Sequence, residues 1–136
     1  MFTKITTIYI VLSYLLFANI FRGADSCFLY YKVHVTFINH LPAYFPQPLL
    51  VHCASKDDDL GNHTLTLNQR WGFAFCVKPF STLFKCQLHW NGLKLSIDAY
   101  DAMWVLNPCD KGNCAWTVSA GGAGLPRGNF HSWEDQ

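Results

Sequence analysis

The feature of this sequence that most limits its fold is a series of short stretches in which apolar and polar residues alternate. A period of two is typical of β-strands with one buried face. Residues 32–39 place Val33, Val35 and Phe37 on one face and polar residues on the other. Further strand-like stretches lie at residues 49–53, 63–67, 71–77, 83–90, 93–100 and 114–118. With no helical period among them, these stretches predict an all-β fold, a small antiparallel β-sandwich of about seven or eight strands.

Turn signals separate these predicted strands. Asn91-Gly92 lies between two of them and is a strong hairpin signal, because both residues tolerate positive φ. Three prolines interrupt residues 40–48, where a central strand is therefore excluded. The segment 121–127 is too rich in glycine to be assigned to a strand.

The amino terminus has the layout of a secretory signal. Residues 1–21 are almost continuously apolar, with Lys4 near the start, and small residues follow up to Ser26. A membrane anchor is the alternative, but a spanning helix needs about 20 apolar residues and Arg22 ends this run early. We therefore expect a signal peptide at 1–26, cleaved near Ser26, and a single secreted domain at 27–136 without stable membrane insertion.

The charge content excludes two classes of protein. Only 14% of the 136 residues are charged, and the formal net charge is +1. A disordered chain needs more charge and fewer aromatic residues, and a nucleic-acid binder usually carries a basic excess. A domain of this size buries only about 65% of its unfolded surface, so additional stabilisation from disulfides is expected.

Six cysteines follow the predicted signal, and in an oxidising compartment an even number suggests disulfide bridges. Cys109 and Cys114 enclose four turn-forming residues, so they can meet across the tip of a hairpin. Cys53 and Cys86 each lie in a strand-like stretch, which can place them on facing or adjacent strands.

Cys27 and Cys76 are left over. They form an extra disulfide, or they remain free thiols, with Cys76 buried and Cys27 near a loose terminus. A zinc site is not expected, since the sequence has no Cys-x-x-Cys and no closely paired histidines. We predict no metal and no cofactor.

The acidic run Asp57, Asp58 and Asp59 lacks the alternate spacing of an EF-hand, so it predicts a solvated loop rather than a calcium site. Asn62-His63-Thr64 is an N-glycosylation sequon, expected on a surface loop. No other asparagine of the predicted mature part fits this pattern.

No constellation for catalysis stands out. The sequence has no Gly-x-Ser-x-Gly elbow, and nothing selects a carboxylate pair from Asp98, Asp101 and the loop aspartates. We therefore predict that the protein is not an enzyme. Trp71 and Trp90 share strand faces with apolar residues and are expected in the core, whereas Trp104 and Trp133 are candidates for surface contacts with sugars.

Taken in order, these stretches resemble the plant self-incompatibility S-protein family of secreted S-protein homologues. The resemblance rests on an ordered set of motifs: Val-Thr-Phe-Ile-Asn-His-Leu at 35–41, His-Cys-Ala-Ser-Lys-Asp-Asp-Asp-Leu-Gly at 52–61, Trp-x-Phe-x-Phe at 71–75, Phe84-x-Cys86 with Trp90, and Cys109 to Cys114 with Trp116 close behind. The extra Cys27 and Cys76, and the tail after Ala120, depart from the family pattern.

The resemblance implies a small secreted plant β-sandwich in which Cys53, Cys86, Cys109 and Cys114 are bridged. It also implies a signalling or recognition ligand, related to stigma proteins that cause rejection of self pollen through a pollen membrane receptor. The expected partner is an unidentified cell-surface membrane receptor, and the protein is expected to be a monomer. A secreted lectin-like or defence protein that binds glycans is the alternative.

Recognition is expected in surface loops. By position the candidates are residues 42–48, 55–62 and 101–113, and Lys56, Asp57, Asp58 and Asp59 form the candidate recognition loop proper.

Overall fold

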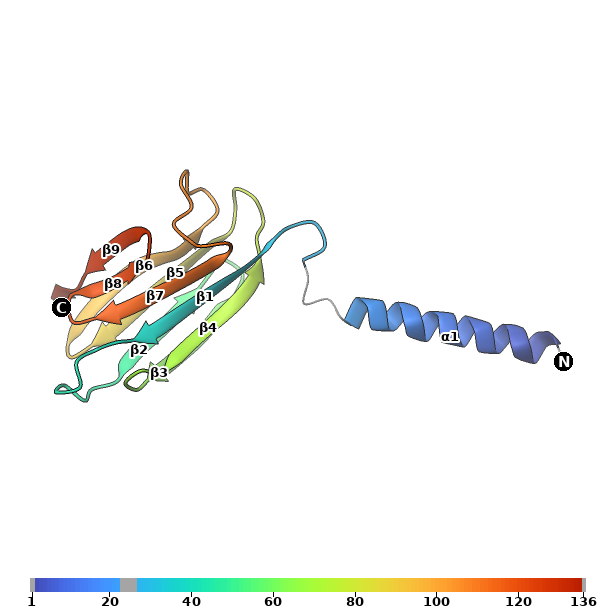
Figure 1. Cartoon of the computed structure of the whole chain (residues 1–136), viewed down its shortest axis with the longest axis horizontal. Coiled ribbons are helices and arrows are strands. Elements are labelled where there is room, and N and C mark those ends of the chain that lie inside the picture. Colours follow the sequence, from blue (N-terminus) through green and yellow to red (C-terminus); the bar gives the residue numbers. More distant parts are fainter. Residues whose placement is uncertain (1, 23–26, 136) are drawn as a thin grey trace.

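A computed structural model describes residues 2–22 and 27–135, and within them the chain forms one helix and ten strands. The strands build two five-stranded sheets that pack face to face, so the predicted disulfide-stabilised β-sandwich is confirmed (Figure 1). The elements are α1 (Phe2–Arg22), β1 (Lys32–Asn39), β2 (Leu49–Ala54), β3 (Asp59–Leu65), β4 (Arg70–Cys76), β5 (Leu83–Trp90), β6 (Leu93–Asp101), β7 (Asn113–Ser119), β8 (Gly122–Leu125), β9 (Gly128–Ser132) and β10 (Glu134–Asp135).

The sheet that we call sheet A has the strand order β4-β1-β7-β8-β9, and sheet B has the order β10-β6-β5-β2-β3. Strand β1 pairs with β4 in antiparallel orientation but with β7 in parallel orientation. The predicted antiparallel arrangement therefore holds for every described pair of strands except β1 with β7. The physical reason is that five strands separate β1 from β7 in the chain, so no hairpin turn forces the two to run in opposite directions.

The glycine-rich tail forms strands that the sequence did not assign. A Cβ at Gly122 would overlap the carbonyl oxygen of His131, and one at Gly124 would lie 2.9 Å from the ring of Phe130. Both contacts are with β9, which pairs with β8. The glycines hide the strand pattern in the sequence because they are the residues that let β9 approach so closely.

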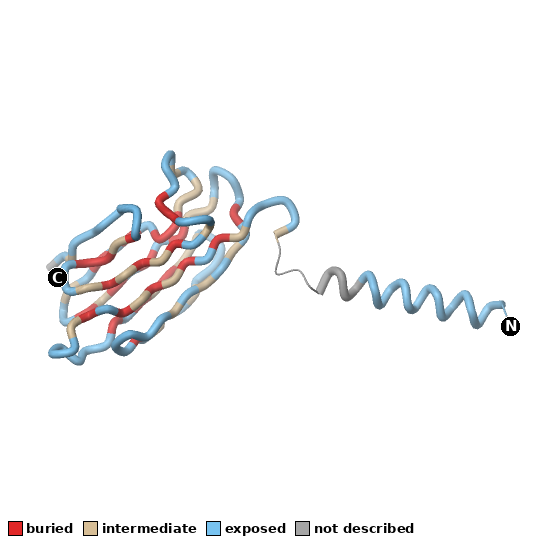
Figure 2. The backbone as a smooth tube through the Cα atoms, viewed as in Figure 1, coloured by how far each residue is buried: buried red, intermediate tan, exposed pale blue. Residues whose placement is uncertain are grey.

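The core lies between the sheets and follows the alternation of the strands. Val33, Val35 and Phe37 of β1 are fully buried, and Figure 2 shows buried positions alternating with more exposed ones along the strands. Trp116 of β7 is also fully buried, and its indole Nε1 donates a hydrogen bond to the carbonyl of Ala99 on β6. This bond joins the two sheets.

Helix α1 extends away from both sheets, and its side chains from Phe2 to Phe17 are exposed (Figures 1 and 2). Among the described residues, no helix reaches the length and apolar character needed to cross a membrane. The predicted cleavage site near Ser26 lies outside the described residues, so the signal peptide at 1–26 stays a prediction.

Candidate functional site

The strand register brings loops from four parts of the chain to one end of the sandwich. Strands β2, β4 and β6 end there, while β1, β5 and β7 begin there. The connecting segments at this end, which we call the disulfide end, are 27–31, 55–58, 77–82 and 102–112 (Figure 1). Two of the three predicted recognition loops therefore lie at the same end, whereas the third, at 42–48, joins β1 to β2 at the opposite end.

Disulfides hold the segments of the disulfide end in place. Cys27 is bonded to Cys76, which fixes the segment before β1 to the end of β4, and Cys109 is bonded to Cys114 across the turn into β7. Of the alternatives that the sequence left open for Cys27 and Cys76, the structure contains the disulfide.

The remaining disulfide lies within one sheet. Cys53 and Cys86 are direct partners on the adjacent strands β2 and β5, with their Cα atoms 4.1 Å apart. The bond therefore fixes the register of sheet B near the disulfide end and does not connect the two sheets.

Large apolar side chains project from three of these segments. Phe28, Leu29, Phe80, Val105 and Leu106 are between 74% and 98% exposed. Sequence reasoning missed them because they lie outside the alternating stretches, and the only available signal was their occurrence in loops that should be polar. Exposed apolar side chains gathered in one region are typical of surfaces that bind other molecules.

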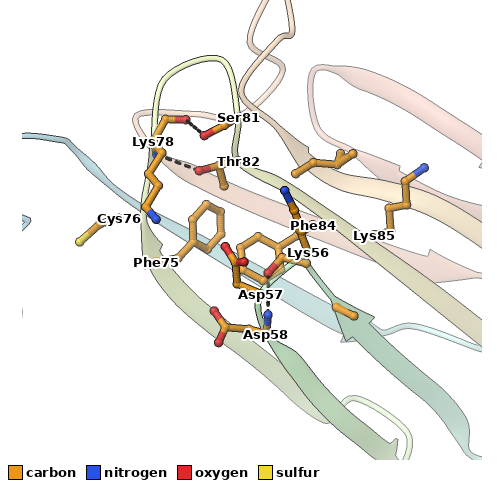
Figure 3. A pocket seen from close by; sticks show the side chains of 13 residues that line it. Lys56, Asp57, Asp58, Phe75, Cys76, Lys78, Ser81, Thr82, Phe84 and Lys85 are labelled. Atoms are coloured by element: carbon orange, nitrogen blue, oxygen red, sulfur yellow. Dashed lines mark hydrogen bonds between the residues drawn. The ribbon is translucent and has the colours of Figure 1, made fainter.

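A cleft of about 780 Å³ opens beside these loops, between the 55–58 loop and the segment that follows β4 (Figure 3). Its apolar part contains Phe75 and Phe84, whose ring centres are 4.5 Å apart. Charged residues from both sides line it: Lys56, Asp57, Asp58, Lys78 and Lys85. The cleft thus combines an aromatic floor with charges of both signs.

Asp59, the fourth residue of the candidate recognition loop, is not part of this cleft. It begins β3, and its Oδ1 lies 2.6 Å from Nε2 of His52 and accepts a 2.9 Å hydrogen bond from the N–H of Gly61. The Gly61 N–H and then His52 lower the pKa of the Asp59 carboxyl below its usual value. This carboxylate therefore links β2 to β3, which is a structural role.

Asn62 lies in a strand and not on the expected loop. The loop ends at residue 58, and Asn62 is an exposed residue of β3 opposite His52 of β2. The strand begins early because the register of β2 and β3 shifts between His52 and Ala54, which lets Asp59 pair with Ala54. Strand β3 is an edge strand, so the sequon remains accessible, and its glycosylation stays a prediction.

The tryptophans differ partly from expectation. Trp90 is buried as predicted, whereas Trp71 is half-buried and stacks on His63 with ring centres 3.8 Å apart. Trp133 packs against Trp90 and donates a hydrogen bond from its indole N–H to the carbonyl of Ser119, so it is not an open platform.

Trp104 is half-buried against Tyr100 and lines a smaller hollow of about 450 Å³. Asp98, Asn129 and His131 lie in the same hollow. In the part of the chain that the structure describes, no group of three or more histidine, cysteine, aspartate or glutamate side chains is placed to hold a metal ion.

Comparison with known proteins gives one family. Residues 34–133 match the family model of plant self-incompatibility protein S1. S-protein homolog 29 of Arabidopsis thaliana is 34% identical over 131 residues, which cover 95% of this chain and 92% of that protein. S-protein homologs 5 and 2 of the same plant are 40% and 38% identical over shorter stretches, covering 55% and 54% of this chain. The matched stretches span 58% and 48% of those two relatives. No solved structure gives a significant match.

Proposed function

Because the chain belongs to the plant self-incompatibility protein S1 family, we propose that it is a secreted extracellular ligand that a cell-surface membrane receptor recognises. The proposed role is signalling by binding, in the manner of stigma proteins that cause rejection of self pollen, and the proposed form is a monomer without enzymatic activity. Secretion is supported by the three disulfides, which form and persist in oxidising compartments.

One observation carries this proposal: the exposed apolar side chains and the charged cleft lie together at the disulfide end. A ligand without a catalytic site needs a stable surface with groups that a partner can bury, and disulfides hold this surface in one conformation. Apolar anchors surrounded by charged residues are the usual composition of such interfaces. We therefore place the receptor contact at the disulfide end.

The test is binding of the fluorescently labelled secreted protein to plant cells, including pollen. The variant Val105→Ser/Leu106→Ser removes the two most exposed large apolar side chains of the 102–112 segment and should weaken binding about tenfold or more, as expected for interface anchors. Tyr44→Ser is the matched control, since Tyr44 is 77% exposed at the opposite end. If Val105→Ser/Leu106→Ser still binds saturably while Tyr44→Ser does not, the receptor contact is not at the disulfide end. If the unmodified protein shows no saturable binding, the ligand role is rejected.

A lectin-like function is the second candidate, and the hollow beside Trp104 favours it. An aromatic ring next to a carboxylate, an amide and an imidazole is a set of groups that suits a sugar. Under this hypothesis Trp104→Leu should lose signal on a glycan array, while Val105→Ser/Leu106→Ser keeps it. An array without signal for the unmodified protein would exclude this function for the glycans displayed.

A further inference from the structure

The sandwich has four edge strands, and three of them carry features that prevent the addition of another strand. Edge strands expose unpaired backbone groups, so proteins usually protect them with bulges, charges or very short strands. In β3 the pairing register shifts, Asp59 carries a charge and Gly61 has a φ of 77°. Strand β9 has a register shift and begins with two residues of positive φ, Gly128 and Asn129, and β10 has only two residues.

Strand β4 has none of these features between its ends. Its seven residues pair with β1 in unbroken register, from Cys76 opposite Lys32 to Arg70 opposite Ile38. From Trp71 to Phe75 the strand contains no charge and no proline, and β4 is the outermost strand of sheet A (Figure 1).

The register also shows which backbone groups face the free edge. The N–H of Val77 donates to the carbonyl of Tyr31, and the N–H of Asn39 donates to the carbonyl of Gln69, so the hydrogen-bonded pairs join odd-numbered residues. In an antiparallel pair such residues alternate with residues whose N–H and C=O groups point away from the partner. The N–H and C=O groups of Gly72 and Ala74 therefore face outward.

The side chains at these two positions are also small. A Cβ at Gly72 would lie only 2.5 Å from the carbonyl oxygen of Val35, so this position requires glycine. Ala74 carries a single methyl group. Another strand can therefore approach the edge without meeting a bulky side chain.

The inner face of the same strand leads into the cleft at the disulfide end. Trp71, Phe73 and Phe75 are half-buried and point toward sheet B, and Phe75 lines the cleft with Phe84 (Figure 3). A strand added to β4 would place every second side chain over these rings. Arg70 and Lys78 lie at the two ends of β4, and neither forms an ion pair within the described residues.

From these features we propose that the free edge of β4 binds an extended segment of a partner protein, which adds a sixth strand to sheet A. The segment has apolar residues at every second position and acidic residues near its ends, because the edge offers aromatic rings along its inner face and a cation at each end. This inference rests on the proposed function, since the receptor would supply the segment.

The test uses the secreted protein and a displayed library of random peptides of about ten residues, the upper end of usual strand lengths. Peptides selected on the unmodified protein should show alternating apolar residues and flanking acidic residues. Ala74→Pro removes the outward N–H of residue 74 and should weaken their binding about tenfold. Ala74→Val keeps the N–H and should leave binding unchanged. Peptides that bind all three proteins equally, or a library that yields no binders, would overturn the proposal.

If Ala74→Pro does not fold, hydrogen exchange on the unmodified protein tests whether the peptide binds at the β4 edge. The amides of Gly72 and Ala74 should exchange rapidly in the free protein and slowly with a selected peptide bound. Slowing at β3 or β9 instead would contradict the proposal. A dimer of the free protein that Ala74→Pro dissociates would also overturn it, by assigning the edge to a second copy of the chain.

Cell binding separates this inference from the proposed function. If the unmodified protein binds no cells but peptides still protect β4, the receptor-ligand function fails and the strand-addition site stands. If Ala74→Pro binds cells as well as Ala74→Val does, the ligand function stands and β4 is not its contact.

Discussion

Asn39 is the single fully buried polar side chain in the described part of the chain. Its side-chain NH₂ donates a 3.0 Å hydrogen bond to the carbonyl of Leu65, and its Oδ1 accepts a 2.9 Å bond from the N–H of Leu41. Asn39 ends β1 in sheet A, and Leu65 ends β3 in sheet B. One amide group thus satisfies two backbone groups and joins the two sheets where both strands end.

Asn39→Ala should lower the free energy of unfolding by about 2–4 kcal/mol, because a buried carbonyl and a buried N–H each lose their partner. Urea unfolding at neutral pH measures this value. Asn113→Ala is the control: Asn113 is exposed, and the change should stay within about 0.5 kcal/mol. Equal losses for the two variants would show that the Asn39 hydrogen bonds contribute nothing.

The Asp59 carboxylate predicts a pH dependence of stability. Its pKa is lower in the folded protein than the usual value of 3.8, so ionised Asp59 stabilises the fold above about pH 4. This contribution is lost as the pH falls through the folded-state pKa. The stability difference between the unmodified protein and Asp59→Asn should therefore be constant between about pH 5 and 7 and disappear below pH 4.

Urea unfolding at a series of pH values measures this difference. His52→Gln tests its cause: the hydrogen bond from the N–H of Gly61 is the largest single cause of the lowered pKa of Asp59, so part of the pH dependence should remain in this variant. A pH dependence that vanishes completely in His52→Gln would contradict this order.

At the scale of elements, the disulfides differ in what they constrain. The Cys53–Cys86 bond joins neighbouring strands across a separation of 33 residues, and the Cys109–Cys114 bond closes a turn with a separation of 5. In the chain-entropy model the stabilisation grows with the length of the closed loop, because a longer loop loses more freedom in the unfolded state.

Replacing Cys53 and Cys86 by alanine should therefore cost about 4 kcal/mol, and replacing Cys109 and Cys114 about 2 kcal/mol. Denaturant unfolding of the two double variants measures the difference. Cys27 and Cys76 are separated by 49 residues, but Cys27→Ala/Cys76→Ala should cost less than about 4 kcal/mol. Without this disulfide residues 27–31 gain freedom in the folded protein as well, which offsets part of the entropy that the unfolded chain gains. A larger loss for the short loop than for the long one would rule out the entropic explanation.

For the whole molecule, the charges on the outer faces of the two sheets differ. Lys85 and Asp98 form an ion pair on sheet B, which also carries His52 with Asp59 and the sequon at Asn62. On sheet A the outward residues of β1 and β4 include Lys32, His34 and Arg70 beside Gly72 and Ala74, without an acidic residue among them. A glycan on Asn62 would extend from the exposed side of β3 and shield that edge.

A non-reducing peptide mass map of protein from the medium of expressing plant cells tests this assembled state. We expect a terminus near Ser26, three linked peptides that contain the pairs Cys27–Cys76, Cys53–Cys86 and Cys109–Cys114, and a glycan on Asn62. An uncleaved and reduced chain held inside the cell would contradict secretion, and an unmodified Asn62 would leave the β3 edge without this shield.

The sequence by itself determined the sandwich and most of its strands, because alternation of apolar and polar residues is a local property that a sheet with one buried face imposes. It also indicated the Cys109–Cys114 hairpin, whose partners are close in the chain. Only the tertiary structure decided the parallel pairing of β1 with β7 and the strand-forming role of Gly122 and Gly124, since both depend on contacts between distant segments.

The parts of the candidate site were also visible in the sequence to different degrees. Lys56, Asp57 and Asp58 stood out as a charged loop, but the other residues of the cleft come from distant parts of the chain: Phe75 from β4, Lys78 from the segment after it, and Phe84 from β5. Likewise, the alternation in 71–77 predicted a strand without revealing that β4 is an edge. Local patterns specify which residues face the core, whereas the order of strands in a sheet is set by long-range packing, and this order decides which backbone groups remain free to bind.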